Sequence, residues 1–274
     1  MKAVLSFCTL LLARASLAAP PTVTRGNGSI TVANADYTAI ISEANGSLSR
    51  LEARAFGPAT CIAGGMTYAD IGVLGPSRHP FLGTPPATGA AVTVTNEGGQ
   101  VIVAAEGALA LEGGKPPSGV KWRYRFRYTF GESPVVHVVA GVQTDTARPA
   151  AGGFLATALN VSGVREWFAD TEKGMQWVDL GTENARCFEA RRTPLRDDHR
   201  RIGLINDRNG AVVLFDHIRA EPAGALEDVL FHSGGTGSVT AFFAWLDGTS
   251  QTVFEPGKWC ELAFDVSITG RLPE

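Results

Sequence analysis

Cysteine is scarce in this chain of 274 residues, and its four cysteines form no metal or redox motif. No two of them stand in a CxxC spacing, which removes the zinc-ribbon and thioredoxin-type interpretations. Cys8 lies in the apolar N-terminal segment, so Cys61, Cys187 and Cys260 remain for the rest of the chain. These three allow at most one disulfide, and small buried thiols, with or without one such bond, are expected.

The usual short signatures of catalysis are also missing. There is no GxSxG nucleophile elbow, HExxH zinc motif, EF-hand loop or P-loop. An excess of basic residues is missing as well, because 24 Lys and Arg stand against 27 Asp and Glu. Neither a nucleic-acid partner, a metal nor a cofactor is therefore expected. Paired carboxylates for glycoside hydrolysis stay open, because their spacing is spatial and not sequential.

Sustained helical periodicity is absent, and short alternating segments take its place. The clearest is residues 120–130, VKWRYRFRYTF, where a period of two indicates a strand. One face of this strand is aromatic and is expected to be core. The other face carries Lys121, Arg123, Arg125, Arg127 and Thr129. That basic face is either an exposed sheet surface whose charges prevent aggregation or a surface that binds an anionic glycan.

More than a dozen such strands are expected, separated by Gly, Pro, Asn and Asp. A meander over residues 30–51 turns at Asn45-Gly46, because both residues tolerate positive φ. Residues 58–88 are expected to be loop-rich, and residues 226–231 either a short helix or a strand. With no fixed repeat and no linker, the sequence predicts an all-β fold, a large antiparallel β-sandwich. The remaining expected strands are residues 91–95, 100–105, 135–142, 154–161, 187–190, 202–206, 211–216, 238–245 and 259–268.

The N-terminus has the layout of a secretory signal peptide. Lys2 gives a short basic start, residues 4–13 are apolar, and residues 16–18 supply the small residues of a cleavage site. A membrane anchor is the alternative, but the apolar run is too short to span a bilayer. We expect residues 1–18 to be a signal peptide and residues 19–274 a single domain. A secreted or periplasmic location without a membrane span follows.

Two stretches resemble the galactose mutarotase-like β-supersandwich. The first is residues 30–51, strand, gap, strand, Asn-Gly, strand, followed by Ala-Phe-Gly. The second is residues 254–259, FEPGKW, leading into a last alternating strand. The resemblance spans nearly all of the chain after residue 18 and implies a supersandwich fold with carbohydrate as the ligand class. Members include aldose epimerases, domains of polysaccharide lyases and glycoside hydrolases, and non-catalytic domains, so the fold does not choose the reaction.

The epimerase signature itself is only partly present. The family's general acid is a His in a His-x-aromatic-aromatic context, whereas His137 precedes two valines and residues 79–81, His-Pro-Phe, match in part. The family also uses a late Glu base. Glu255 and Glu261 are late acids, but both fit ordinary strand-end positions. His137, in an apolar strand, is expected to be a hydrogen-bonded core residue.

Arginine- and histidine-rich stretches supply the candidate site. Residues 191–201, RRTPLRDDHRR, form either a solvated loop with internal ion pairs or a groove lining that neutralises uronate carboxylates. A histidine there has the chemistry to move a proton. Residues 78–81 stand in a Gly/Pro loop, where His79 either packs the loop or acts in β-elimination. The predicted catalytic residues are His79, His199 and Tyr124, and the predicted substrate-binding residues are Arg78, Arg192 and Arg200.

Two functions follow from these observations. The first is a secreted carbohydrate-active protein that binds or processes an oligo- or polysaccharide, with an acidic polysaccharide favoured and lyase- or epimerase-like proton transfer as the chemistry. The second is a non-catalytic carbohydrate-binding or structural module of the cell envelope, which the lack of a strong catalytic motif supports.

Overall fold

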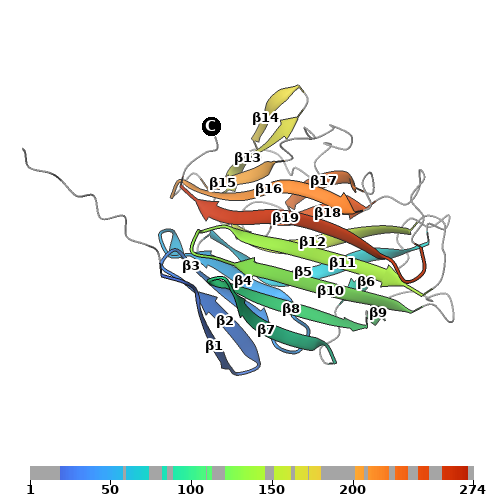
Figure 1. Cartoon of the computed structure of the whole chain (residues 1–274). Coiled ribbons are helices and arrows are strands. Elements are labelled where there is room, and N and C mark those ends of the chain that lie inside the picture. Colours follow the sequence, from blue (N-terminus) through green and yellow to red (C-terminus); the bar gives the residue numbers. More distant parts are fainter. Residues whose placement is uncertain are drawn as a thin grey trace, which may run out of the picture.

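Two large antiparallel sheets make up the protein (Figure 1). The computed structural model describes residues 19–57, 60–73, 82–84, 89–108, 110–112, 121–145, 151–161, 164–171, 173–179, 201–206, 209–221, 226–233, 240–246 and 255–270. Within these residues no helix is long and apolar enough to cross a membrane.

The first sheet has eight strands in the order β1-β2-β3-β4-β5-β12-β18-β17. It begins as a sequential meander and then takes up strands from the second half of the chain. Its strands are β1 (Thr22–Gly26), β2 (Ser29–Ala33), β3 (Tyr37–Ser42), β4 (Leu48–Ala53), β5 (Thr60–Val73), β12 (Ala151–Val161), β17 (Leu226–Ser233) and β18 (Thr240–Leu246).

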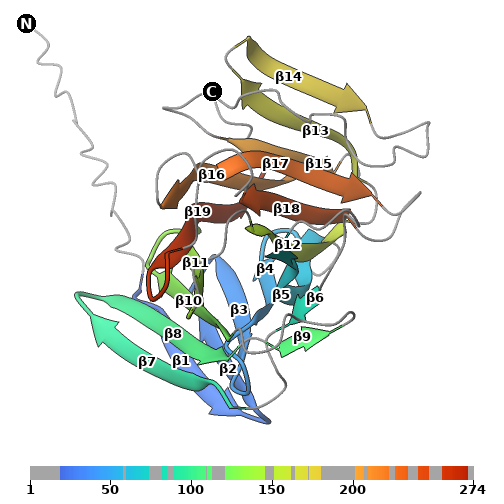
Figure 2. The same ribbon diagram turned by 90° about the vertical axis from the view of Figure 1, so that its right-hand side faces the viewer.

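The second sheet has nine strands in the order β14-β13-β15-β16-β19-β11-β10-β8-β7. Its ends are β13 and β14 on one side and β7 and β8 on the other (Figures 1 and 2). Its strands are β7 (Ala91–Glu97), β8 (Gln100–Ala108), β10 (Trp122–Phe130), β11 (Val136–Thr144), β13 (Val164–Thr171), β14 (Gly174–Asp179), β15 (Ile202–Asn206), β16 (Ala211–Glu221) and β19 (Trp259–Thr269). A small two-stranded sheet joins β6 (Leu82–Thr84) to β9 (Ala110–Glu112).

The core lies between the two large sheets, and in strands such as β3 and β10 it is built by alternation of buried and outward residues. The aromatic face of β10 is buried against β2, β3 and β4 of the other sheet. Two hydroxyls also link the layers, since Tyr124 donates to the carbonyl of Asn45 at 3.0 Å and the Leu48 amide donates to Tyr128 at 3.1 Å. The odd-numbered residues of β10 therefore face away from the core.

The Asn45-Gly46 turn between β3 and β4 packs directly against β8 of the other sheet. Gly46 has φ of +70°, and a Cβ built on it would stand 1.9 Å from the Cβ of Ala105 on β8. Both the backbone conformation and the space therefore require glycine. The predicted turn is confirmed, and the structure adds the close packing as a second reason for it.

Several local predictions are confirmed and two are corrected. The all-β sandwich, the meander and the β10–β11 hairpin are as expected, and residues 226–231 belong to a strand. The loop-rich prediction for residues 58–88 is wrong over Thr60–Val73, which forms β5, and over Leu82–Thr84, which forms β6. Pairing on both sides with β4 and β12 outweighs the irregular pattern and Gly64-Gly65. Strand β1 was also missed, and it pairs with β2 through a tight turn at Asn27-Gly28.

Candidate functional site

On the outward face of the nine-stranded sheet, strand register aligns side chains in rows that run across the strands. Three adjacent rows define the candidate site. The middle row holds Ala263, Val139, Arg127, Ala104 and Thr93, each directly opposite the next on β19, β11, β10, β8 and β7. Because its members other than Arg127 are small or medium-sized, this row is lower than the two beside it. A groove therefore runs across five strands.

The groove has a volume of about 710 Å³. Its floor is formed by four residues of the middle row, Thr93, Ala104, Arg127 and Val139, and the rows on either side supply its walls. Arg125, Glu106 and Glu261 stand on one side, and Thr129 and His137 on the other. The site thus joins two guanidinium groups, two carboxylates, two hydroxyls and an imidazole in one concave surface, a combination suited to a polar ligand.

Arg125 is held across the sheet by an acid and an aromatic ring. Its Nε and Nη2 each lie 2.7 Å from Oε1 of Glu261. Its guanidinium carbon is 4.3 Å from the ring centroid of Trp259. Gly141 lies between these strands, directly opposite both Arg125 and Glu261. Since glycine has no side chain, the arginine can reach over β11 and stack on the indole.

Arg127 differs from its neighbours because it stands in the middle row, exposed to solvent. Arg123 pairs with Glu106 and Arg125 pairs with Glu261, but Arg127 makes no ion pair with the residues that the structure describes. Its guanidinium therefore keeps its donors for a ligand. A planar guanidinium binds carboxylate or phosphate oxygens through two parallel hydrogen bonds.

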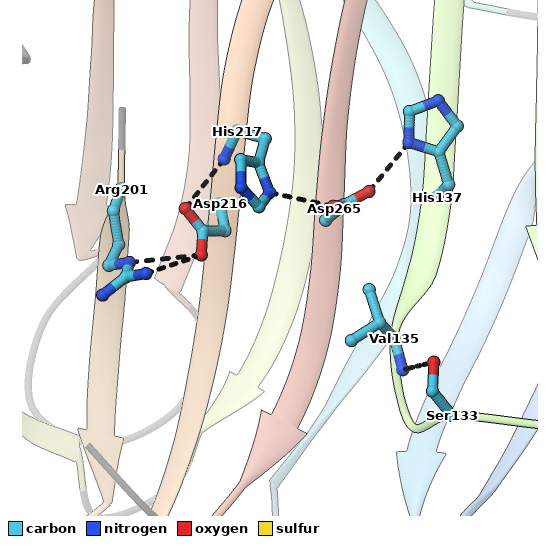
Figure 3. A network of polar contacts seen from close by, with 7 residues as sticks. All are labelled: Ser133, Val135, His137, Arg201, Asp216, His217 and Asp265. Atoms are coloured by element: carbon cyan, nitrogen blue, oxygen red, sulfur yellow. Dashed lines mark hydrogen bonds and ion pairs between the residues drawn. The ribbon is translucent and has the colours of Figure 1, made fainter. Parts of the chain in front are cut away.

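His137 stands at the edge of the groove and shares a carboxylate with a second histidine (Figure 3). Its Nδ1 is 2.8 Å from Oδ1 of Asp265, and Nδ1 of His217 is 3.0 Å from Oδ2 of the same carboxylate. An ionised carboxylate only accepts hydrogen bonds, so both rings donate from Nδ1. In the neutral form each ring then has an unprotonated Nε2.

The second histidine reaches this face through an irregularity in β16. The register shifts between Asp216 and Arg219, and His217 has φ of +52°. Arg201 fixes the preceding residue, since its Nε and Nη2 lie 3.2 and 3.0 Å from Oδ2 of Asp216. A bulge of this kind re-aims a side chain, and a positive φ outside glycine marks a backbone held by its surroundings.

The groups of this face are arranged for hydrogen bonding and proton transfer. Among the described residues, no set of three or more His, Cys, Asp and Glu side chains is placed to hold a metal ion. The donors of the two histidines are directed at Asp265, which leaves their Nε2 atoms as the reactive positions.

Of the residues predicted for the site, the structure places Tyr124 inside the sandwich. Its side chain is fully buried on the core face of β10, opposite in direction to Arg125, and burial raises the pKa of its hydroxyl to about 12. The other five predicted site residues, Arg78, His79, Arg192, His199 and Arg200, lie outside the described residues. The basic face of residues 121–129 is on the outer surface and lines the groove in part.

His137 was expected in the core, and that expectation is wrong in part. It is hydrogen-bonded, but its side chain is 37% exposed on the outer face. The buried neighbours Val136 and Val138, together with the outward Val139, hide the alternation in a continuous apolar run. Asp265 and His217 were not predicted at all, because no local pattern marks two residues that meet only through strand pairing.

Comparison with known proteins identifies the fold of this chain through similar solved structures. No protein-family model matches the chain, and no curated protein sequence matches it. Among solved structures, a putative mutarotase (YeaD) from Salmonella typhimurium is similar at 10% identity and a TM-score of 0.54, covering 92% of this chain and 94% of that one. A galactose 1-epimerase from Lactobacillus acidophilus NCFM is similar at 9% identity and 0.53, covering 90% and 96%. A GalM/aldose epimerase homologue from C. elegans is similar at 8% and 0.53, covering 85% and 96%.

These likenesses extend over most of every chain compared, at identities too low for anything but the fold. The protein has the galactose mutarotase-like β-sandwich fold, as the two ends of its sequence suggested. Its two antiparallel sheets and shared core agree with that architecture.

Proposed function

We propose that this protein binds a carbohydrate in the groove of the nine-stranded sheet and that the ligand is an acidic glycan. The observation that carries the proposal is Arg127, an exposed guanidinium in the lowest row of the groove that pairs with no described carboxylate. A uronate carboxylate offers two coplanar oxygens, which match the fork of an arginine.

The walls of the groove support a sugar as the rest of the ligand. Glu106, Glu261 and Thr129 offer oxygen acceptors for sugar hydroxyls, and the Thr129 hydroxyl also donates. The groove is open along the sheet, which suits an extended oligosaccharide. The similar solved structures described as mutarotase and galactose 1-epimerase act on sugars by their descriptions, and this favours the same ligand class here.

Processing by epimerase- or lyase-like proton transfer is the catalytic form of this proposal. His137 is the described group that faces the groove and has the chemistry for it, because Asp265 fixes its ring with Nε2 unbonded to the carboxylate. A non-catalytic carbohydrate-binding or structural module of the cell envelope is the second candidate. Its supporting observation is that Glu261, a late acid in the sequence, is engaged by Arg125.

Isothermal titration with D-galacturonic acid, a galacturonate oligosaccharide and neutral D-galactose tests the ligand. We expect the uronates to bind more tightly than galactose, and Arg127→Gln to weaken uronate binding by about tenfold or more, in line with loss of a charge-assisted hydrogen bond. Arg54→Gln is the matched control, because Arg54 is exposed after β4 on the other sheet.

The outcomes separate the candidates. Equal loss in both variants, or equal binding of uronate and galactose, contradicts the acidic ligand. Release of an unsaturated product from the galacturonate oligosaccharide, or faster anomer exchange of the sugar, supports processing. Binding without turnover supports the non-catalytic module. No binding of any of the three sugars contradicts the proposed function as a whole.

A further inference from the structure

Two histidines, on the strands that flank β19 in the nine-stranded sheet, are held by one carboxylate of β19. Strands β11 and β16 both pair with β19, and the register puts His137 and Asp216 directly opposite Asp265. His137 binds one oxygen of Asp265 and His217 binds the other (Figure 3). Asp265 is 128 positions from His137 and 48 positions from His217 in the sequence, so the arrangement exists only in the folded chain.

The backbone of β16 is bent in a way that brings the second histidine to this face. Phe215 is buried and Asp216 points outward, so alternation alone would turn residue 217 toward the core. Instead His217 adopts φ of +52° and is exposed, while Ile218 takes the buried position with 1% exposure. Such a conformation costs on the order of 1 kcal/mol outside glycine, and strain of this kind gathers at functional sites.

Within the described residues, the ion pairs of Asp265 are those with the two histidines. Asp216 is engaged by Arg201, and among the described residues no lysine or arginine pairs with Asp265. The charged group directly opposite His137 is Asp265 on β19, and from β10 the charged group diagonally across is Arg127, two residues from Thr129. Those that face His217 are Asp216 and Arg219 on its own strand, Asp265 on β19, and Arg201.

When one of the two rings carries an additional proton at Nε2, its positive charge balances the single negative charge of Asp265. In that state one ring is an imidazolium and the other a neutral imidazole with a free Nε2. The two rings are 37% and 57% exposed for His137 and His217, so both present their outer edges to solvent. One acid and one base then stand side by side on the same carboxylate.

We propose that His137, Asp265 and His217 form one acid–base unit that exchanges protons with a ligand held in the adjoining groove. One ring accepts a ligand hydroxyl proton at Nε2 while the other gives its Nε2 proton to a second ligand oxygen, so the charge of the unit does not change. Asp265 is a positioning residue, since it acts by fixing both rings in the Nδ1–H tautomer. The unit rests on the proposed carbohydrate ligand for its substrate, but its tautomers are a property of the free protein.

The first test reads the tautomers directly by 15N NMR of histidine-labelled protein, at a pH where the imidazoles are neutral. We expect both His137 and His217 to show a protonated Nδ1 and an unprotonated Nε2. Asp265→Asn keeps one acceptor oxygen and replaces the other by an NH₂ donor. One of the two rings must then change to the Nε2–H tautomer. Glu52→Gln, which alters an ion-paired carboxylate on β4 of the other sheet, leaves both tautomers unchanged.

The second test measures anomer exchange of D-galacturonic acid by NMR line shape and saturation transfer. Loss of general acid–base catalysis lowers rates by about 100-fold or more, and we expect such a fall in Asp265→Asn, His137→Gln and His217→Asn. Binding of the sugar should fall by much less than the exchange rate, because all three variants keep Arg127 as the partner of the sugar carboxylate. Asparagine is chosen at position 217 because it tolerates the left-handed backbone.

The outcomes distinguish this inference from the proposed function. Nε2–H tautomers in the wild-type protein, or tautomers that Asp265→Asn does not alter, overturn the unit even if sugar binds. Unchanged exchange rates in the three variants, or no exchange above the buffer rate in the wild type, overturn its catalytic role. If the tautomers are as expected and no sugar binds, the proposed ligand fails while the paired histidines stand.

Discussion

The guanidinium of Arg125 lies 4.3 Å from the centre of the Trp259 ring, on the solvent side of β11. The residue beneath it on β11 is Gly141, and a Cβ there would stand 3.1 Å from Cγ of Arg125 and 3.2 Å from Cε3 of Trp259. Arg125, held against this ring, stands in one wall of the groove, and Arg127 is the guanidinium in its floor. The position of this wall therefore depends on the absence of one methyl group.

Replacing that glycine should move the wall. In Gly141→Ala the new methyl group displaces Arg125 from the indole, so we expect a change in Trp259 fluorescence and a loss of uronate affinity of about fivefold, the equivalent of roughly 1 kcal/mol. The control is Gly131→Ala, because a Cβ at Gly131 meets nothing within 4 Å. Unchanged affinity for the uronate in Gly141→Ala would contradict a role of the Arg125–Trp259 contact in ligand binding.

The contact between the β3–β4 turn and β8 should dominate the stability of that corner. Gly46→Ala combines a left-handed backbone with overlap onto Ala105, and a loss of about 3 kcal/mol is expected from the sum of strain and overpacking. Gly57→Ala shares the positive φ but meets nothing within 4 Å, so it should lose only about 1 kcal/mol. Urea unfolding of both variants measures the difference.

Buried tyrosines should make the protein sensitive to alkali. Burial raises the pKa of Tyr124 from 10.0 to about 12, and it also raises the pKa values of Tyr37 and Tyr128. Above pH 10 the unfolded chain loses these protons while the folded chain keeps them, so the unfolded state binds fewer protons and the stability falls as pH rises. Thermal unfolding between pH 8 and pH 12 should show this fall, and Tyr124→Phe should reduce its slope. A melting temperature that is constant to pH 12 contradicts it.

Cys260 should be an unreactive thiol in the folded protein. It is free and buried on β19, and burial, followed by the charges of Glu261 and Glu221, raises its pKa from 9.0 to about 12. Since the thiolate is the reactive form, iodoacetamide should label Cys260 only after denaturation. Mass spectrometry of the peptide with and without urea measures this, and rapid labelling of the native protein would contradict it.

Much of the fold could be predicted because its signals are local. The alternation in residues 120–130 separates a core face from a basic face, and the structure buries Tyr124, Phe126, Tyr128 and Phe130 as that pattern requires. Turn chemistry at Asn45-Gly46 likewise marked the turn between β3 and β4, and Pro256-Gly257 marked the turn before β19. The predictions failed where local patterns are weak, as in β5, whose place comes from pairing with β4 and β12.

The sequence by itself determined which residues alternate, where the chain turns and that the strands form a sandwich. These follow from side-chain period and backbone preference, which act over a few residues. Only the tertiary structure decided that Asp265 meets His137 and His217 and that Arg125 crosses Gly141 to Glu261. The reason is physical: strand register and a single bulge in β16 bring these side chains together, and pairing between distant strands leaves no mark in the residues next to them.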